Sequence, residues 1–396
     1  MRTDYDYIIC GAGCAGLSLL MRMMLNPFFH NKKILVADKS PKQKNDRTWC
    51  FWEKEEDIFE SIVHHRWSNL AFHSASFSSV LNIAPYKYKM IRSIDFYNYV
   101  LKEAEKNDNI SFLYDDVKQV YSQNGSGFVK TGNGTYSASY IFSSIITGEK
   151  KFLFNENNPE KPGGIYTLLQ HFKGWLIETD KEIFDMNTAG FMDFRVPQAH
   201  GTTFVYVLPV SSRKALIEYT LFSQKLLPPH VYDDALKNYT GSYLLNTSYN
   251  IAEEEYGIIP MSNYKFKQQE GRVVYIGTAG GQTKASSGFT FTFIQKQTRL
   301  IADMLAAGKP LQLKDNFTKR KFEFYDSVLL HVLHYNKMKG DEVFAAIFKK
   351  NPPQRVLAFL DNETGIWDDL KILRSVPSGI FLPAALHEIM KIFDSK

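Results

Sequence analysis

Three glycines near the start of the chain have the spacing of a phosphate-binding turn. Gly11, Gly13 and Gly16 form the pattern G-x-G-x-x-G, and the residues before them, from Tyr5, have the pattern of an apolar strand. In such a turn the first glycine permits a tight bend, the second lets the backbone approach a pyrophosphate, and the third lets a helix pack closely. The N-terminus of that helix would face the phosphate charge. The pattern predicts a dinucleotide site.

An aspartate stands where such a site needs an acceptor for a ribose. Residues 33–37 have the pattern of a second apolar strand, and Asp38 ends it, 38 − 16 = 22 residues after Gly16. A carboxylate there accepts hydrogen bonds from an adenosine ribose. A glycine turn in an unrelated α/β fold, with Asp38 as a solvated loop acid, is the alternative. We favour the dinucleotide interpretation because all parts of the fingerprint occur in order.

A second glycine loop lies late in the chain. An apolar strand pattern leads into Gly277, Thr278, Gly280 and Gly281, and a helical pattern begins at Phe289. In flavoproteins that open with a dinucleotide turn, the chain returns to the first domain at such a loop. The loop and the helix N-terminus then approach the flavin. The two loops together favour FAD as the cofactor.

Two arginines are further candidates for cofactor contacts. Arg47 stands beside Trp49 and Trp52 in a segment with the composition of a loop that returns over a cofactor. A Trp-rich corner of the core with a surface ion pair is an equal alternative. Arg92 precedes a helical pattern and would either hold a cofactor phosphate or pair with a carboxylate.

Three acids interrupt apolar strand patterns in the middle of the chain. Glu178, Asp193 and Glu218 are flanked by aliphatic and aromatic residues. Such acids usually face outward from a sheet, which is the simpler interpretation of each one. A carboxyl group that faces inward has a raised pKa and can donate a proton in a dry site.

The composition is that of an ordinary globular chain of two or three structural units. The 396 residues carry a formal net charge of +5 spread along the sequence, which is no nucleic-acid footprint. Cys10, Cys14 and Cys50 lack metal-ligand spacing and fit a reducing, cytoplasmic compartment. His331 and His334 lack supporting acids or cysteines, so we expect helix-surface histidines and no metal site.

Neither a signal peptide nor a membrane span is expected. The chain enters a strand directly, and no apolar run approaches the ~18 residues of a spanning helix. Attachment to a membrane surface is compatible with this pattern. The apolar segment 380–386 would help such docking, or would be a buried C-terminal helix, which we favour.

The elements that must position these residues alternate between helix and strand at first and become strand-rich later. We predict an α/β fold with a Rossmann-like FAD-binding domain of the aromatic hydroxylase or geranylgeranyl reductase type. That domain is assigned to residues 1–80, 140–150 and 262–310. An antiparallel β-sheet substrate domain is assigned to residues 81–139 and 151–261, and a helical region to residues 311–396. The polar segment 149–164 is a candidate boundary.

Motifs over most of the chain resemble those of the bacterial lycopene β-cyclases, flavoproteins of carotenoid biosynthesis. The motifs are residues 11–16, 45–52, 91–97, 172–179, 192–196, 216–220, 256–261 and 276–281. Two departures stand out. Gly277-Thr278 replaces the Gly-Asp of hydroxylase relatives, which removes a carboxylate contact to the flavin. Glu218-Tyr219 retains only the first of two acids, so Glu218 is the acid that the resemblance assigns to catalysis.

The resemblance implies cyclisation of the linear ends of lycopene, with other acyclic carotenoids as related substrates. It also implies FAD that is active when reduced, NADPH as reductant, and peripheral attachment to the inner face of the cell membrane. In this chemistry a buried acid protonates an alkene, and Glu218 is the first candidate and Asp193 the second. Aromatic faces would stabilise the cation. The candidates are Phe289 and Phe293, on one helix face, and Trp49, Trp52 and Trp175.

Two other classes of function fit the same motifs. An FAD monooxygenase or a prenyl reductase would change the mass of its product, whereas a cyclase would not. A carotenoid- or flavin-binding protein without catalysis would bind both molecules and be insensitive to Glu218→Gln.

Overall fold

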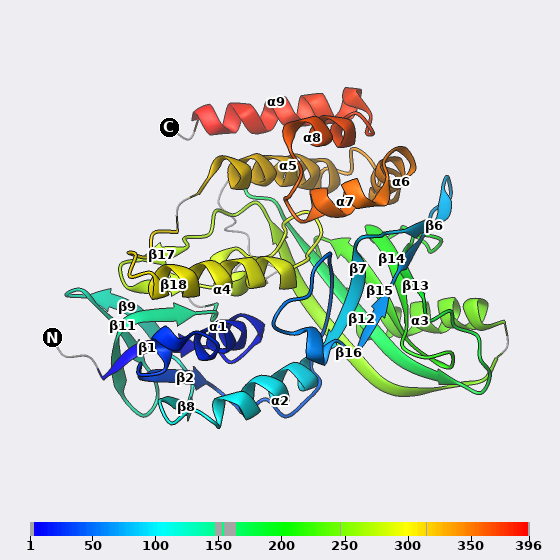
Figure 1. The fold of residues 1–396 in the computed structure, drawn as a ribbon. Helices are drawn as coiled ribbons and strands as arrows, with labels where there is room; N and C mark the ends of the chain where they lie inside the picture. The colour runs from blue at the N-terminus through cyan, green and yellow to red at the C-terminus, as the bar shows by residue number, and fades with distance from the viewer. Residues whose placement is uncertain (1–3, 147–152, 154–163, 246, 314, 395–396) are drawn as a thin grey trace.

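The computed structural model describes residues 4–146, 153, 164–245, 247–313 and 315–394. Figure 1 shows two large β-sheets side by side, with helices from the C-terminal part of the chain above them. The predicted combination of an α/β unit, a mostly antiparallel sheet and a helical C-terminal region is confirmed.

The first sheet carries the N-terminal glycine turn. Its main path has the order β17-β18-β11-β1-β2-β8, and the central neighbours pair in parallel. The strands are β1 (Tyr5–Cys10), β2 (Ile34–Asp38), β8 (Ile110–Tyr114), β9 (Gln119–Gln123), β10 (Ser126–Lys130), β11 (Thr135–Ser143), β17 (Gln269–Glu270) and β18 (Val273–Tyr275). The helices packed with them are α1 (Cys14–Met24), α2 (Ser93–Ala104) and α4 (Phe291–Ala306). The apolar runs 7–10 of β1 and 34–37 of β2 follow from this, because a parallel sheet covered on both faces has no solvated side.

The second sheet has seven strands in the order β16-β12-β15-β14-β13-β5-β6. They are β5 (Asn69–His73), β6 (Ser78–Asn82), β12 (Thr167–Thr179), β13 (Thr188–Asp193), β14 (Thr202–Pro209), β15 (Lys214–Ser223) and β16 (Tyr249–Ser262). One face packs against α3 (Pro229–Leu244) through an apolar cluster. A small sheet of β3 (Thr48–Glu53), β7 (Lys87–Arg92) and β4 (His65–Trp67) completes the strands in the described part of the chain.

Several strands pair in a different sheet from the one in which the expected domain bounds would group them. β8 to β11 fall in residues 81–139 and just beyond, which the sequence assigned to the substrate domain, but they belong to the first sheet. Conversely, β5 and most of β6 fall in residues 1–80 and belong to the second sheet. A period-2 pattern identifies a strand but not its partner, which explains both differences. The candidate boundary at 149–164 lies almost wholly outside the described residues.

The C-terminal region is helical, as expected. It consists of α5 (Phe317–His334), α6 (Gly340–Lys350), α7 (Pro353–Leu360), α8 (Ile366–Leu373) and α9 (Ser378–Asp394). Helix α9 packs against α5 through Val328, Val332 and Ala384, whereas Leu382 and Leu386 are exposed. Segment 380–386 therefore has one buried face and one exposed face, so the expectation of a buried C-terminal helix holds for only part of it.

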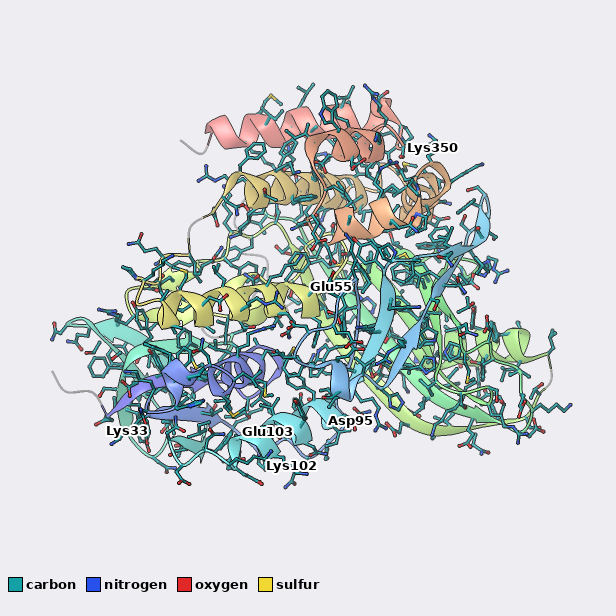
Figure 2. All side chains as sticks on the ribbon, in the orientation of Figure 1. Lys33, Glu55, Asp95, Lys102, Glu103 and Lys350 are labelled. Atoms are coloured by element: carbon teal, nitrogen blue, oxygen red, sulfur yellow. The ribbon has the colours of Figure 1, made fainter. Side chains whose placement is uncertain are left out.

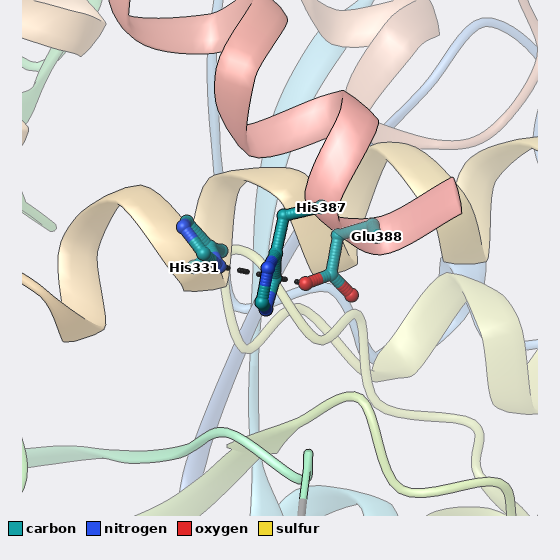
Figure 3. A group of neighbouring side chains, drawn as sticks. All are labelled: His331, His387 and Glu388. Atoms are coloured by element: carbon teal, nitrogen blue, oxygen red, sulfur yellow. Dashed lines mark ion pairs between the residues drawn. The ribbon is translucent and has the colours of Figure 1, made fainter. Parts of the chain in front are cut away.

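The prediction of surface histidines is wrong for His331, which is buried between α5 and α9. Figure 3 shows it beside His387 and Glu388, a trio whose ligand atoms are close enough together for a metal ion. Lys337 Nζ lies 2.7 Å from His331 Nε2, and Tyr166 Oη lies 2.8 Å from Nδ1. Burial and the Lys337 charge lower the pKa of His331 to about 4. Both nitrogens of the neutral ring are engaged, and Tyr166 in turn donates to Glu388 Oε1 of α9 at 2.7 Å, so the link from α5 to α9 runs through Tyr166.

Candidate functional site

A cavity of about 370 Å³ lies where the first glycine turn faces the second sheet. That volume is within the range of small-molecule sites. Its walls come from α1 and the turn before it, from β3 and β7, from the open face of the second sheet, and from the loop before α4. The predicted site residues among its lining are Gly13, Arg47, Glu218, Gly277 and Thr278.

The first glycine turn has the shape that a pyrophosphate needs. Gly11 has φ +98°, and a Cβ on Gly16 would lie 1.9 Å from the Gly11 carbonyl oxygen, so both positions require glycine. A Cβ on Gly13 would meet nothing within 4 Å, which leaves the backbone open to the cavity. Asp38 accepts a hydrogen bond from the Ala12 backbone N–H at 2.7 Å. Asp38 thus fixes the turn from the end of β2.

The second glycine loop touches the first. Gly277 has φ +59°, and a Cβ there would lie 2.8 Å from the Cβ of Ala15 on α1. Gly280 and Gly281 shape the loop behind it, since a Cβ on Gly280 would lie 2.2 Å from the Tyr275 carbonyl oxygen. These two glycines are absent from the cavity lining.

The lining also offers an acceptor for a polar ligand. Gln170 Oε1 is buried in the cavity wall and has no hydrogen-bond partner among the described residues. A Cβ on Gly288, which also lines the cavity, would lie 1.8 Å from that oxygen. Together with the open turn at Gly13 and the contact between the two loops, this arrangement fits a flavin nucleotide.

The two arginines differ in position. Arg47 lines the cavity at the start of β3. Arg92 instead forms a two-point ion pair with Asp95 at 2.7 and 2.9 Å, and it is absent from the cavity lining. Asp95, labelled in Figure 2, lies in the first turn of α2 and is absent from the cavity lining. Of the two alternatives for Arg92, the structure has the pairing with a carboxylate.

Glu218 faces the cavity because of strand alternation. Its neighbours on β15, Ile217 and Tyr219, pack on the α3 face of the sheet, so the side chain between them points to the opposite face. Thr220 Oγ1 donates to Glu218 Oε1 at 2.6 Å. Burial raises the pKa of Glu218 well above its usual value, and the Glu255 charge raises it further. The raised pKa favours the protonated form of Glu218, which is the form that can donate a proton.

Glu255 on β16 is a site residue that the sequence did not reveal. Thr48 Oγ1 donates to its Oε2 at 2.8 Å, and its carboxyl group lies within hydrogen-bonding reach of Glu218. Burial raises the pKa of Glu255, whereas Thr48, Glu218 and Arg47 oppose that rise. Glu253-Glu254-Glu255 has the composition of a solvated edge, and only the family motif that begins at Tyr256 pointed to this stretch.

Asp193 lies on the other face of the sheet. Tyr239 of α3 donates to its Oδ2 at 2.9 Å, and Arg195 donates to both of its oxygens. Burial alone would raise the pKa of Asp193, but these hydrogen bonds and the Arg195 charge hold it below the usual value. Asp193 is thus ionised and is absent from the cavity lining. The structure brings Glu218 and Glu255 together and leaves Asp193 apart.

Aromatic rings form much of the wall. Phe289 and Trp49, both expected there, line the cavity. Phe293 does not, because α4 begins at Phe291, after Phe289, and the expected helix face does not extend to Phe289. Trp52 stands behind Phe289 at 4.6 Å between ring centroids, and Trp175 packs on the α3 face. Further aromatic residues of the lining are Tyr88, Tyr97, Phe172, Tyr206 and Phe291.

The fold and the two glycine loops define a class: the α/β fold of FAD-dependent reductases, hydroxylases and halogenases. A geranylgeranyl bacteriochlorophyll reductase-like protein from Thermoplasma acidophilum aligns with a TM-score of 0.59 and 11% identity over 98% of each chain. A flavin-dependent brominase gives 0.60 and 12% over 99% of each chain. The p-nitrophenol 4-monooxygenase of Pseudomonas putida gives 0.56 and 13% over 97% of this chain and 98% of the other.

Within this class, the chain belongs to the lycopene cyclase family. The family model described as "Lycopene cyclase protein" matches residues 6–384, nearly the whole chain, which confirms the resemblance found in the sequence motifs. No curated protein matches the chain.

Proposed function

We propose that this protein is a lycopene β-cyclase that converts the linear ends of lycopene to β-rings, giving β-carotene by way of γ-carotene. Family membership supports the substrate class. The observation that carries the proposal is Glu218, whose carboxyl group has a strongly raised pKa and faces the same cavity as the two glycine loops. Protonation of an unactivated alkene requires such an acid, shielded from water.

FAD is the proposed cofactor, and its binding residues follow from the cavity. The open backbone at Gly13 and the N-terminus of α1 would hold the pyrophosphate, and Asp38 lies at the strand end where a ribose would be held. Gly277, Thr278 and Gln170 line the part that would receive the isoalloxazine ring. When bound and reduced by NADPH, FAD would supply negative charge near the cavity, which stabilises a cation without net redox change.

The residues of this chain would carry the proton. Glu218 donates its proton to the terminal double bond, the neighbouring double bond closes on the cation, and a ring proton returns to a carboxylate of the site. No atom is gained or lost in this sequence, so the reaction is an isomerisation. The rings of Trp49 and Phe289 contribute about 0.5–2 kcal/mol each through cation–π contacts. The apolar lining excludes the water that would otherwise capture the cation.

Attachment to the inner face of the cell membrane is the second part of the proposal, since lycopene and related acyclic carotenoids dissolve in lipid. Among the described residues, none of the helices is long and apolar enough to span a bilayer. Large apolar side chains are nevertheless exposed on α8 and α9, the uppermost helices in Figure 1. We define the α8–α9 surface as Ile366, Trp367, Leu370, Leu373, Leu382, Leu386, Ile389 and Met390. Exposed apolar surface of this kind favours docking on a bilayer.

The test is conversion of lycopene in liposomes by the purified chain with reduced FAD and no oxygen. We expect β-carotene of unchanged mass, by chromatography and mass spectrometry. Glu218→Gln should lower the rate by about 100-fold or more, as expected for loss of a general acid. Glu178→Gln, an exposed position on the neighbouring strand β12, is the matched control and should retain the wild-type rate. A product that gains oxygen or hydrogen would indicate a monooxygenase or a prenyl reductase. Bound carotenoid without conversion would indicate a binding protein.

A further inference from the structure

Gly174 stands between the two carboxylic acids of the site. It pairs with Glu218 across β12 and β15, and with Glu255 across β12 and β16. Residues directly opposite one another in antiparallel strands share a face of the sheet. The three residues therefore form one row on the cavity face, with glycine in the middle. Two neighbouring strand spacings amount to roughly 10 Å, which two glutamate side chains can bridge only if nothing stands between them.

The space above Gly174 is already in use. A Cβ there would lie 3.0 Å from Glu255 Cγ, 3.0 Å from Leu216 Cδ1 and 3.4 Å from Glu255 Oε1. The φ of Gly174 is not in the left-handed region, so its backbone conformation does not require glycine. A side chain at position 174 would therefore crowd Glu255 and Leu216, whereas the backbone conformation itself does not require glycine.

One carboxyl oxygen of the two acids lacks a hydrogen-bond donor. Thr220 donates to Glu218 Oε1 and Thr48 donates to Glu255 Oε2, so each carboxyl group has one oxygen engaged by a threonine. Glu255 Oε1 is buried and has no donor among the residues that the structure describes. The Glu218 carboxyl group lies within hydrogen-bonding reach. A proton on Glu218 supplies the missing bond.

We propose that Glu218 and Glu255 share a single proton across Gly174, so that they act as one acid with a net charge of −1. Two buried carboxyl groups within hydrogen-bonding reach of each other cannot both be ionised, so the pair retains one proton. Arg47 and Thr48 favour the ionised form on Glu255, which places the proton on Glu218, the member that lines the cavity. Gly174 is a positioning residue that acts only by leaving the bridge open.

This inference rests on the proposed function and deepens it, because it explains how the acid that donates the proton remains protonated. Its test needs no carotenoid. The test is an infrared pH titration of the full chain in H₂O and D₂O, following the C=O stretch of protonated carboxylic acids. At neutral pH the wild type should show a band from the shared proton, and Glu218→Gln should abolish that band. A separate band from Asp361 should remain in both proteins, because burial raises the pKa of Asp361 to about 7. Gly174→Ala should lower the midpoint of the shared-proton band by about one pH unit or more, because it separates the acids.

Two further variants make the titration decisive. Gly241→Ala on α3 introduces a Cβ that meets nothing within 4 Å, and its band should titrate as in the wild type. Glu255→Gln removes the neighbouring charge without crowding the sheet, and it should lower the midpoint even where Gly174→Ala fails to fold. An unchanged midpoint in Glu255→Gln, or the same set of protonated-carboxyl bands in Glu218→Gln as in the wild type, would overturn the shared proton.

The two proposals fail separately. Titration as expected, combined with no conversion of lycopene, would leave the shared proton in place and overturn the cyclase assignment. Conversion of lycopene, combined with a Glu218 titration midpoint that is the same with and without Glu255, would support the cyclase assignment and overturn the shared proton.

Discussion

Tyr239 Oη donates a hydrogen bond of 2.9 Å to Asp193 Oδ2, and this contact ties the end of β13 to helix α3 on the side of the sheet away from the cavity. Asp193 and Glu218 are both acids within apolar strands, yet their pKa values move in opposite directions. Arg195 and Tyr239 hold the pKa of Asp193 below its usual value, whereas burial and the neighbouring Glu255 raise that of Glu218.

Asp193 is therefore expected to stabilise the fold and to take no part in chemistry. Asp193→Asn should lower the free energy of unfolding by about 1–3 kcal/mol, since it weakens hydrogen bonds to a buried charge. The lower end applies if solvent screens the pair, because the Arg195 side chain is 53% exposed. Urea unfolding measures the loss, and the rate of lycopene conversion per folded molecule should not change.

Asp180→Asn, at an exposed position in the turn after β12, is the control and should leave the free energy of unfolding unchanged. A large fall in the conversion rate of a folded Asp193→Asn protein would show that Asp193 takes part in catalysis.

Glu218 should give the stability of the protein a characteristic pH dependence. Its native pKa lies above the ordinary value of 4.5, so between these two values the native state holds a proton that the unfolded state has lost. The free energy of unfolding then falls as pH rises through this window, by up to about 1.4 kcal/mol per pH unit for one proton. Glu218→Gln removes this contribution, so the variant should be more stable than the wild type at the alkaline end.

Urea unfolding at mildly acidic and mildly alkaline pH measures the two slopes. Glu178→Gln should keep the wild-type slope, because its side chain is exposed on β12. An identical slope in the wild type and Glu218→Gln would contradict the raised pKa, whatever the activity of either protein.

Local features of the site could be predicted from sequence, and pairings between distant strands could not. The turn at Gly11 to Gly16 and the acid at Asp38 lie within one strand–helix–strand unit, so their spacing along the chain determines their geometry. The pattern of an acid in an apolar strand predicted Glu218 as a catalytic candidate, and it predicted Asp193 equally. Period-2 alternation defines two faces of a strand but does not say which face meets the cavity. Glu255 was missed for a related reason, since its partner lies two strands away and 37 residues earlier, 255 − 218 = 37.

Contacts that the sequence does not specify also limited the prediction for Arg92 and for the assignment of strands to domains. The sequence leaves Arg92 a choice between a phosphate and a carboxylate, and Asp95, three residues on, is the partner in the structure. Residues 81–139 were expected to belong to an antiparallel sheet, but the parallel pairing of β8 with β2 and of β11 with β1 joins segments far apart in the chain.

The second glycine loop should depend on a buried ion pair with the C-terminal helices. Lys284, in the loop between Gly281 and α4, donates to Asp326 of α5 at 2.6 Å and to Asn362 at 2.8 Å. The Lys284 side chain is 0% exposed, so Lys284→Met would leave Asp326 buried without its cation. We expect a loss of about 3–5 kcal/mol in the free energy of unfolding. Weaker flavin binding should accompany it, measurable by quenching of flavin fluorescence.

Lys267→Met is the matched control, since Lys267 and Glu270 form an exposed pair, and it should cost less than about 1 kcal/mol. Equal losses in the two variants would show that the loop does not rely on Lys284.

The α8–α9 surface should control binding to lipid. Trp367 is 79% exposed on α8 and Leu386 is 60% exposed on α9, and the exposed Lys371 and Arg374 lie on and just after α8. Lys350 lies at the same end of the molecule (Figure 2). Removing an apolar side chain from a lipid contact costs about 1.5–3 kcal/mol, so the double variant Trp367→Ser, Leu386→Ser should bind anionic liposomes at least about tenfold more weakly. Flotation with liposomes measures the affinity.

Leu300→Ser on α4 removes a side chain of similar exposure, 50%, from outside this surface and should bind liposomes as the wild type does. Conversion of lycopene dispersed in detergent should be unaffected in all three proteins, because the cavity is intact. If the double variant bound liposomes normally, docking would have to use another surface. If it lost activity in detergent as well, the exposed residues would contribute to the cavity and not only to attachment.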